Sequence, residues 1–378
     1  MCRITAALLV GVMALSAVAS ALDGPEFHGF ISPAALKSSA NDYLAKSHRG
    51  SFELTEAALN ATEVFSPSLR MGAQIFSSQI GSQGGFETEF DWYYLDWHRY
   101  SWLGLRAGRV KVPFGLFNEL SDYDPGRLTV LLPQSVYPLI SRNFLLSATG
   151  LDLYGRREIG PAGALAYSLV GGTIYVPLPE GAPPGWTVDV PWMADGRLLW
   201  ETPLDGLTFG ASVLGAQAIA DTVAQGKMTH VDLHALLWLA SVEYLRGRLR
   251  LDAEYGRWNV RTFVTPPQKL SNVPTGMLIS ERYYVQGAWR FTDDLEAGLY
   301  YAGLFSDIFH RTTPGSFQHD VALSFRYDLT MHWLVKLELH YLHGTAGLQA
   351  ALNGVGNGDL GKLTQDWGLV LVRTTAYF

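Results

Sequence analysis

The sequence predicts an all-β fold, a transmembrane antiparallel β-barrel of about sixteen strands with short periplasmic turns and long extracellular loops. Three observations carry this prediction. Apolar and polar residues alternate with a period of two along segment after segment, as in strands with one apolar and one polar face. The connections between these segments are short and long in turn. Beyond the N-terminus, no stretch has the roughly 18–20 uncharged residues that a membrane-spanning helix needs.

The N-terminal segment has the pattern of an export signal. One arginine precedes an apolar run from Ile4 to Val18, and small residues follow. We expect cleavage after Ala21, so that residues 1–21 are a signal peptide and residues 22–378 form a single barrel domain. The only cysteine, Cys2, lies in this signal, so the mature chain has no thiol for a disulfide or a metal site.

The composition narrows the class of partners. Without the arginine of the signal, 28 − 1 = 27 basic residues stand against 35 acidic ones, so the chain lacks the basic excess of nucleic-acid-binding proteins. Aromatic residues are abundant, with 18 Tyr, 18 Phe and 11 Trp, whereas helical periodicity is almost absent. We expect no nucleic-acid partner and no cofactor.

Counting the alternation along the chain predicts about sixteen strands, most of them near the roughly 9–11 residues with which a tilted strand crosses a bilayer. Both termini then lie on the side of the short turns. In chain order, the expected strands are 26–33, 51–63, 68–79, 86–98, 102–112, 149–158, 163–175, 193–202, 207–218, 229–244, 248–260, 279–291, 295–306, 316–328, 332–344 and 364–378.

The polarity of the two strand faces favours a barrel. In segment 248–260, for example, Asp252 and Glu254 share one face and Leu251 and Tyr255 share the other. A soluble β-sandwich shows comparable alternation and stays an alternative. Aromatic residues near the segment ends favour the barrel, because they form girdles at the membrane interfaces. The tryptophans in such places are Trp92, Trp102, Trp192, Trp289, Trp333 and Trp367.

Two motifs resemble those of bacterial outer-membrane porins. The last strand ends at Phe378, which resembles the assembly signal by which outer-membrane barrels are recognised for insertion, although Ala376 stands where an aromatic residue is common. The segment 108–115, Gly-Arg-Val-Lys-Val-Pro-Phe-Gly, followed by Asn118 and Glu119, is similar to a strand end of general and phosphate-selective porins.

The resemblance implies a sixteen-stranded porin of the bacterial outer membrane, through which small hydrophilic solutes and ions diffuse passively. It also implies a homotrimer, contact with outer-membrane lipid, and insertion by the barrel-assembly machinery. A substrate-specific channel remains an alternative. The tandem basic ladders of phosphate-specific porins are not evident in this sequence, so no such anion site is carried over.

The connection 113–148 is the longest expected loop, and in sixteen-stranded porins the corresponding loop folds inward and narrows the pore. Its segment 128–133 is too apolar for a loop in water. The loop carries acidic residues and the strand before it carries basic ones, an arrangement that would set a transverse field across the constriction. Arg109 and Lys111 share a strand face, and Arg106 is expected to point away from it unless a bulge intervenes. The expected constriction residues are Arg106, Arg109, Lys111, Glu119, Asp122 and Asp124.

Further charged residues are expected to line the lumen from their phase in the strands, and their mixed signs predict weak ion selectivity. Alternatively, these charges only pair between neighbouring strands and keep the lumen wet. They are Arg70, Asp91, Asp152, Arg156, Arg248, Arg250, Asp252, Glu254, Arg282, Arg290, Asp320, Arg326, Lys336 and Glu338.

Catalytic and metal sites find little support in the sequence, so we do not expect an enzyme. A phospholipase-like outer-membrane enzyme is the alternative, with Ser306 and His310 near one strand end as candidates. His230, Asp232 and His234 occupy alternate positions and share a strand face. The two histidines are then about 13 Å apart, too far for one metal ion. We therefore expect no catalytic residues and no metal.

Overall fold

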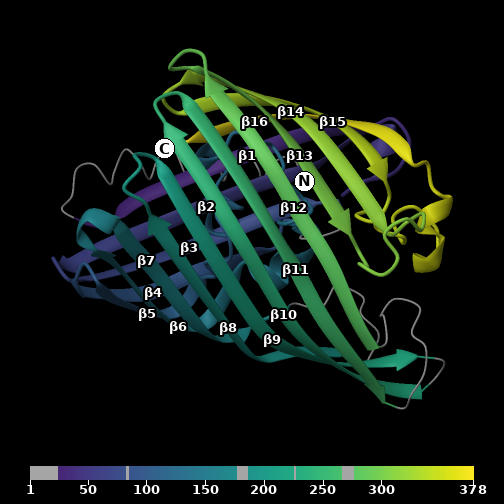
Figure 1. The fold of residues 1–378 in the computed structure, drawn as a ribbon, viewed down its shortest axis with the longest axis horizontal. Coiled ribbons are helices and arrows are strands. Elements are labelled where there is room, and N and C mark those ends of the chain that lie inside the picture. The colour runs from purple at the N-terminus through teal and green to yellow at the C-terminus, as the bar shows by residue number, and fades with distance from the viewer. Residues whose placement is uncertain (1–23, 82–84, 177–185, 225–226, 266–275) are drawn as a thin grey trace.

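The computed structural model confirms the predicted fold class. It describes residues 24–81, 85–176, 186–224, 227–265 and 276–378. Within these residues, sixteen antiparallel strands form one closed barrel (Figure 1). The expected signal peptide, residues 1–21, lies outside the described residues.

Each strand pairs with its neighbours in sequence, and β1 pairs with β16. The strands are β1 (Glu26–Ser38), β2 (Ser51–Ser66), β3 (Leu69–Ile80), β4 (Thr88–Tyr100), β5 (Leu103–Lys111), β6 (Ser147–Glu158), β7 (Ala164–Ile174), β8 (Thr187–Glu201), β9 (Leu207–Ala224), β10 (Lys227–Arg246), β11 (Leu249–Thr265), β12 (Gly276–Arg290), β13 (Leu295–Phe305), β14 (Phe317–Thr330), β15 (Trp333–Gly344) and β16 (Asp366–Tyr377).

The two chain ends close the barrel. Phe30 on β1 stands opposite Tyr377 on β16, and Gly29 and Phe378 exchange backbone hydrogen bonds of 3.2 and 3.1 Å. A Cβ atom at Gly29 would lie 3.0 Å from the Phe378 ring and 2.9 Å from the carbonyl oxygen of Ala58, so this closure needs glycine. A closed sheet leaves no edge, and every strand can therefore satisfy its backbone groups inside a bilayer.

The apolar face of the strands points outward. On β11, Leu251 and Tyr255 are 45% and 38% exposed, whereas Asp252 and Glu254 are 1% and 2% exposed. The same inversion recurs on β14 and β15, where exposed leucines alternate with buried charged or hydroxyl side chains. A soluble β-sandwich buries its apolar face, so this polarity decides between the two expected architectures.

Two strands are longer than expected because they continue through a proline. β1 continues past Pro33 to Ser38, and β8 begins at Thr187 and contains Pro191. Proline has no N–H for a ladder hydrogen bond. The β1–β16 ladder skips Pro33, and the β8–β9 ladder has a bulge at Pro191, so the missing donors cost no pairing.

The expected long connection between β9 and β10 is wrong. The two strands pair as far as Ala224 opposite Lys227, which leaves two positions between them. The sequence reading ended these strands too early, because alternation weakens in 219–228 while backbone pairing continues. Among the described residues, no helix is long and apolar enough to cross a membrane.

Candidate functional site

The connection between β5 and β6, residues 112–146 and hereafter the inward loop, lies inside the barrel. Its short helical turns are η2 (Asn118–Leu120), η3 (Asp124–Gly126), η4 (Leu139–Ser141) and α2 (Arg142–Leu145). Side chains from wall strands on all sides bind it, among them Arg197 on β8, Glu254 on β11, Lys336 on β15 and Arg373 on β16. Only a segment within the lumen can reach strands so far apart around the sheet.

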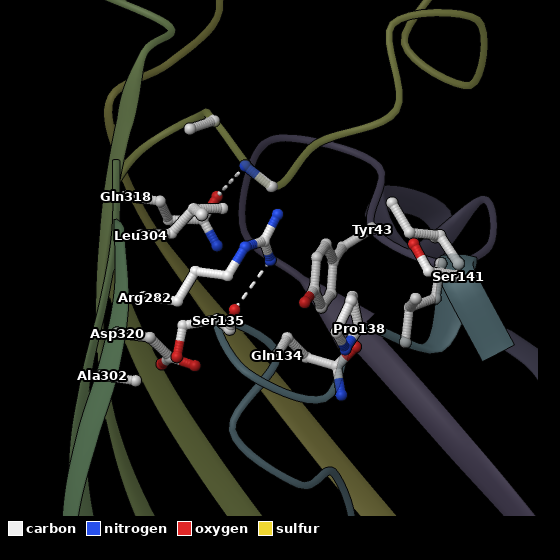
Figure 2. A pocket seen from close by; sticks show the side chains of 14 residues that line it. Tyr43, Gln134, Ser135, Pro138, Ser141, Arg282, Ala302, Leu304, Gln318 and Asp320 are labelled. Atoms are coloured by element: carbon white, nitrogen blue, oxygen red, sulfur yellow. Dashed lines mark hydrogen bonds between the residues drawn. The ribbon is translucent and has the colours of Figure 1, made fainter. Parts of the chain in front are cut away.

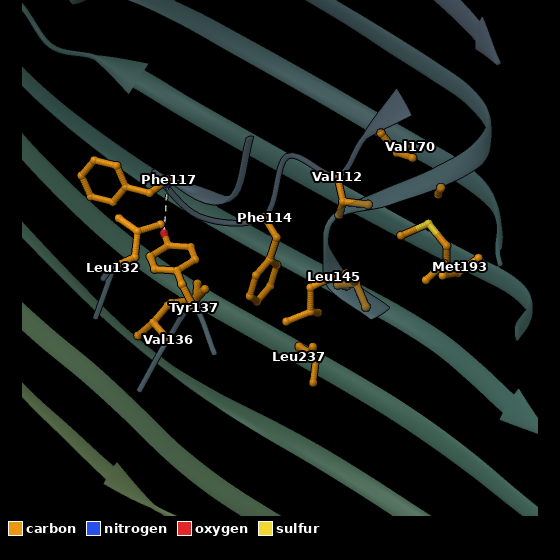
Figure 3. Packing of buried hydrophobic residues seen from close by; sticks show 14 of the residues in the cluster. Val112, Phe114, Phe117, Leu132, Val136, Tyr137, Leu145, Val170, Met193 and Leu237 are labelled. Carbon is orange, nitrogen blue, oxygen red and sulfur yellow. Dashed lines mark hydrogen bonds between the residues drawn. The ribbon is translucent and has the colours of Figure 1, made fainter. Parts of the chain in front are cut away.

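One side of the inward loop is apolar and packs against an apolar part of the wall. Phe114, Phe117, Leu132 and Val136 of the loop belong to one buried cluster (Figure 3). Seven of its wall side chains come from β7 to β10 and are Val170, Ile174, Val190, Met193, Leu214, Leu237 and Leu239, and others come from β5, β6 and β12 to β14. Of the apolar segment 128–133, Leu132 packs in this cluster, and burial of this area stabilises the loop in the lumen.

Tyr137 and Glu254 join the apolar cluster to the polar wall. The Tyr137 hydroxyl donates to Glu254 and accepts the backbone N–H groups of Leu116 and Phe117 at 2.9 and 3.1 Å. Glu254 also accepts from Tyr284 at 2.9 Å. These bonds satisfy a carboxylate that is only 2% exposed, as burial of a charge requires.

The opposite side of the inward loop is held by buried charges. Asp124, which is fully buried, binds Lys336 at 2.9 Å, Arg373 at 3.3 Å and the Thr375 hydroxyl at 2.7 Å. Burial alone would raise the pKa of Asp124, but Lys336, Arg373 and Arg127 hold that pKa well below its usual range. The carboxylate is therefore ionised and anchors the loop to β15 and β16.

Glu338 provides a second anchor on the same side. Its carboxylate accepts the backbone N–H groups of Val130 and Leu131 at 2.7 and 3.0 Å, and the Ser324 hydroxyl at 2.7 Å. Val130 and Leu131 also pack in a second apolar cluster with Tyr43 of the first loop, Leu348 of the last loop and Trp367 of β16. Three loops therefore meet inside the barrel. Trp367 is buried here, 5.6 Å from the Tyr43 ring, so its expected place in an interfacial girdle is wrong.

The expected constriction residues do not form one cluster. Lys111 binds Asp122 of the loop and Asp91 of β4, the latter at 2.7 Å. Burial raises the pKa of Asp122, and the neighbouring Asp91 adds to this effect, whereas Lys111 opposes it. Glu119 binds a different partner, Arg197 on β8, at 2.6 Å.

Asp124 and Arg109 do not take part in the expected pairing of the acidic loop with the basic wall. Asp124 binds β15 and β16 rather than the basic wall of β5. Arg109 donates to the Asp91 carbonyl at 2.9 Å and to the Ser147 hydroxyl at 3.0 Å, not to an acidic loop residue.

Arg106 reaches buried carboxylates although its strand phase is opposite to that of Lys111. It binds Asp152 at 3.0 Å and Asp96 at 3.5 Å. Gly108, between Arg106 and Lys111, has a φ of +140°, and a Cβ there would lie 2.2 Å from the Tyr93 carbonyl oxygen. The β4–β5 and β5–β6 ladders nevertheless have no register shift from Gly104 to Arg109, and Arg106 has the same strand phase as the buried Val110.

The structure places the other charged residues expected in the lumen mostly in ion pairs. Asp320 lies against His340 at 2.9 Å. Arg156, Arg248 and Arg290 are exposed at the short-turn ends of their strands. The arginine pairs are Arg70 with Asp96 (2.7 Å), Arg156 with Glu201 (2.6 Å), Arg250 with Asp252 (2.9 Å), Arg290 with Glu296 (3.3 Å) and Arg326 with Asp328 (2.8 Å).

Sequence reasoning missed several residues of the site. Glu56 and Arg373 form a buried pair at 2.9 Å, and His340 bridges Asp320 and Glu338. Arg373 alternates with the outward Val372 of the last strand, so strand phase was a usable signal. Arg197 had the same signal but lay on a strand whose limits were misjudged.

A cavity of about 430 Å³ remains below the inward loop, at the short-turn end. Its charged lining consists of one glutamate, Glu296, and the five arginines Arg127, Arg248, Arg250, Arg290 and Arg326. Among the described residues, no group of three or more His, Cys, Asp or Glu side chains could hold a metal ion.

Comparison with solved structures identifies this architecture. An anion-selective porin from Comamonas acidovorans matches with a TM-score of 0.55 and 13% identity, over 94% of this chain and 99% of that one. The chain has the fold of bacterial porins. OmpT of Vibrio cholerae in its trimer form matches this porin fold with a TM-score of 0.59 and 12% identity, over 94% and 99% of the chains.

OmpF of Salmonella typhi in complex with daunomycin matches with a TM-score of 0.58 and 11% identity, over 94% and 97% of the chains. No protein-family model and no curated protein matches the sequence. At these identities the likeness establishes the porin fold, and the function has to be argued from the site.

Proposed function

We propose that this protein is a channel of the bacterial outer membrane through which small hydrophilic solutes and ions diffuse passively. The observation that carries the proposal is the inward loop, which is fixed to the wall on two sides of a closed barrel and leaves an arginine-lined cavity of about 430 Å³ beneath it. A loop fixed in this way sets the size and charge of what passes.

The two faces of the wall support a place in a membrane. The outward apolar residues would contact lipid, and the inward charges would keep the path polar. The export signal and the terminal Phe378 favour the outer membrane and insertion by the assembly machinery. Trimer formation is part of the proposal, supported by the trimeric form of OmpT among the matching structures.

The contacts of the candidate nucleophile and base argue against the enzyme alternative. The Ser306 hydroxyl donates to the carbonyl of Ser316 at 3.1 Å, and His310 binds Asp307 at 2.6 Å. The two side chains therefore do not form the hydrogen-bonded nucleophile and base that hydrolysis needs. We infer that the protein has no catalytic function.

Conductance across a planar bilayer, recorded with a salt gradient, tests the proposed channel. Because the loop and its ion pairs occupy much of the lumen, we expect stepwise, ohmic openings of small amplitude. The reversal potential reports whether cations or anions pass more easily. If correctly folded wild-type protein never conducts, the proposed channel function is refuted.

A further inference from the structure

A small cavity lies between the inward loop, the first and last loops, and the wall strands β12 to β14 (Figure 2). Its volume is about 90 Å³, which is room for about three water molecules. Arg282, Gln318 and Asp320 line it from the wall, and Tyr43 and Ser135 line it from the loops. Some polar groups in this cavity have no hydrogen-bond or ion-pair partner among the described residues.

Arg282 is the unbalanced charge. Its guanidinium stacks 3.6 Å from the ring centre of Trp258, Nε donates to Ser280 Oγ at 3.0 Å, and Nη1 donates to the Ser135 carbonyl at 2.7 Å. Within the described residues, Arg282 forms no ion pair and its Nη2 has no hydrogen-bond partner. Stacking and two hydrogen bonds fix the planar group, so that its free N–H groups are directed at the cavity (Figure 2).

Two further donors share the cavity with Arg282. Gln318 Oε1 accepts the backbone N–H of Gly347 at 3.0 Å, which leaves the amide Nε2 as its free end. The Tyr43 hydroxyl faces the cavity from the other side (Figure 2). In the part of the chain that the structure describes, neither Nε2 nor this hydroxyl has a protein partner. Free donors around one cation are the arrangement that binds an oxyanion.

Asp320 also lines the cavity, but its oxygens are bound by other side chains than Arg282. They accept from the Tyr300 hydroxyl at 2.9 Å and from His340 Nδ1 at 2.9 Å. His340 Nε2 faces Glu338 at 2.9 Å, so both ring nitrogens meet carboxylates and both contacts need an N–H. The imidazolium thus lies between the two carboxylates, and among the described residues Arg282 has no carboxylate within ion-pair distance.

We propose that this cavity binds a small monocarboxylate of two or three carbon atoms as it enters the barrel. Arg282 pairs with the carboxylate, and Tyr43 and Gln318 donate hydrogen bonds to it. The cavity size limits the length of the ligand, and the apolar side chains of Ala302 and Leu304 in its lining take the carbon chain. The inference rests on the proposed channel function, because it names a class of solute for the same lumen.

Calorimetric titration of the full-length, detergent-solubilised protein with sodium propionate tests this site independently of conductance. We expect saturable binding to the wild type and none of propionamide, which has the same shape without the charge. Arg282→Gln should weaken binding by about tenfold or more, since hydrogen bonds to charged groups contribute about 1.5–3 kcal/mol. The matched control is Arg157→Gln, at an exposed position of β6, which should bind as the wild type does.

Tyr43→Phe provides a second test that keeps the loop contact of Arg282 intact, with an expected loss of about threefold to tenfold. Propionate binding that is absent in the wild type, equal for propionamide, or unchanged in both variants would overturn the site. Conductance without propionate binding would refute the site and leave the channel standing. Binding by a protein that never conducts would refute the channel and leave the site.

Discussion

The two sides of the inward loop are held by different forces. The side facing β7 to β10 packs through Phe114, Leu132 and their neighbours, a contact that is non-directional and tolerates small shifts. The side facing β15 and β16 is held by Asp124 and Glu338, whose buried partners have defined positions. Apolar packing therefore keeps the loop inside the barrel, and the buried charges decide where in the lumen it lies.

The largest effect is expected from Asp124→Asn on the charged side. The substitution leaves Lys336 and Arg373 buried without their shared carboxylate, and breaking such a contact costs about 3–5 kcal/mol. We expect the loop to detach from β16 and to loosen near Asp124, while Glu338 still holds Val130 and Leu131; this should raise the single-channel conductance and speed hydrogen exchange around 124–129. Asp359→Asn, in the exposed pair with Lys362, is the control. Wild-type conductance and exchange in Asp124→Asn would show that packing alone positions the loop.

On the apolar side, Leu132→Ala should destabilise the docked loop without redirecting it. Leu132 is 4% exposed in the cluster, and truncating a buried leucine costs about 2–5 kcal/mol through lost burial and the cavity left behind. We expect a lower melting temperature in thermal unfolding, with conductance close to wild type because Asp124 still fixes the loop. A conductance increase as large as that of Asp124→Asn would remove the distinction between the two sides.

Lys111→Gln should change ion selectivity more than stability. It removes the cation between Asp91 and Asp122, so the reversal potential in a salt gradient should shift towards cation selectivity. Arg109→Gln is the matched comparison and should shift it less, because Arg109 binds a carbonyl and a hydroxyl instead of carboxylates. Equal shifts would mean that net lumen charge, and not the local pair, sets selectivity.

The smallest effect is expected from Glu119→Gln. Its pair with Arg197 is partly open to solvent, with side chains 34% and 17% exposed, and pairs of this kind contribute below about 1 kcal/mol. The melting temperature should fall only slightly, and less than in Leu132→Ala. A loss of stability as large as the cost expected for Asp124→Asn would show that Glu119 is a third anchor of the loop, at β8.

Strand number, strand phase and the positions of most short turns were predictable from the sequence, because each depends on alternation over neighbouring residues. The outward position of Val370 and Val372 on β16 follows from the same rule. Errors arose where backbone pairing outlasted the alternation, as in 219–224, and on β5, where Arg106 and not Lys111 has the phase of the buried Val110. The acidic character of the loop was also predictable from the sequence. The partner of each carboxylate was not.

The sequence by itself determined that this protein is a barrel with an apolar outside and a charged inside, since a period of two assigns every strand residue to a face. The tertiary structure alone decided which inward charges meet. Asp124 and Lys336 lie 212 positions apart in the chain, and only closure of the sheet and entry of the loop bring them together. Among the described residues, the same closure brings no carboxylate into an ion pair with Arg282, because pairing depends on three-dimensional distance, which strand phase does not encode.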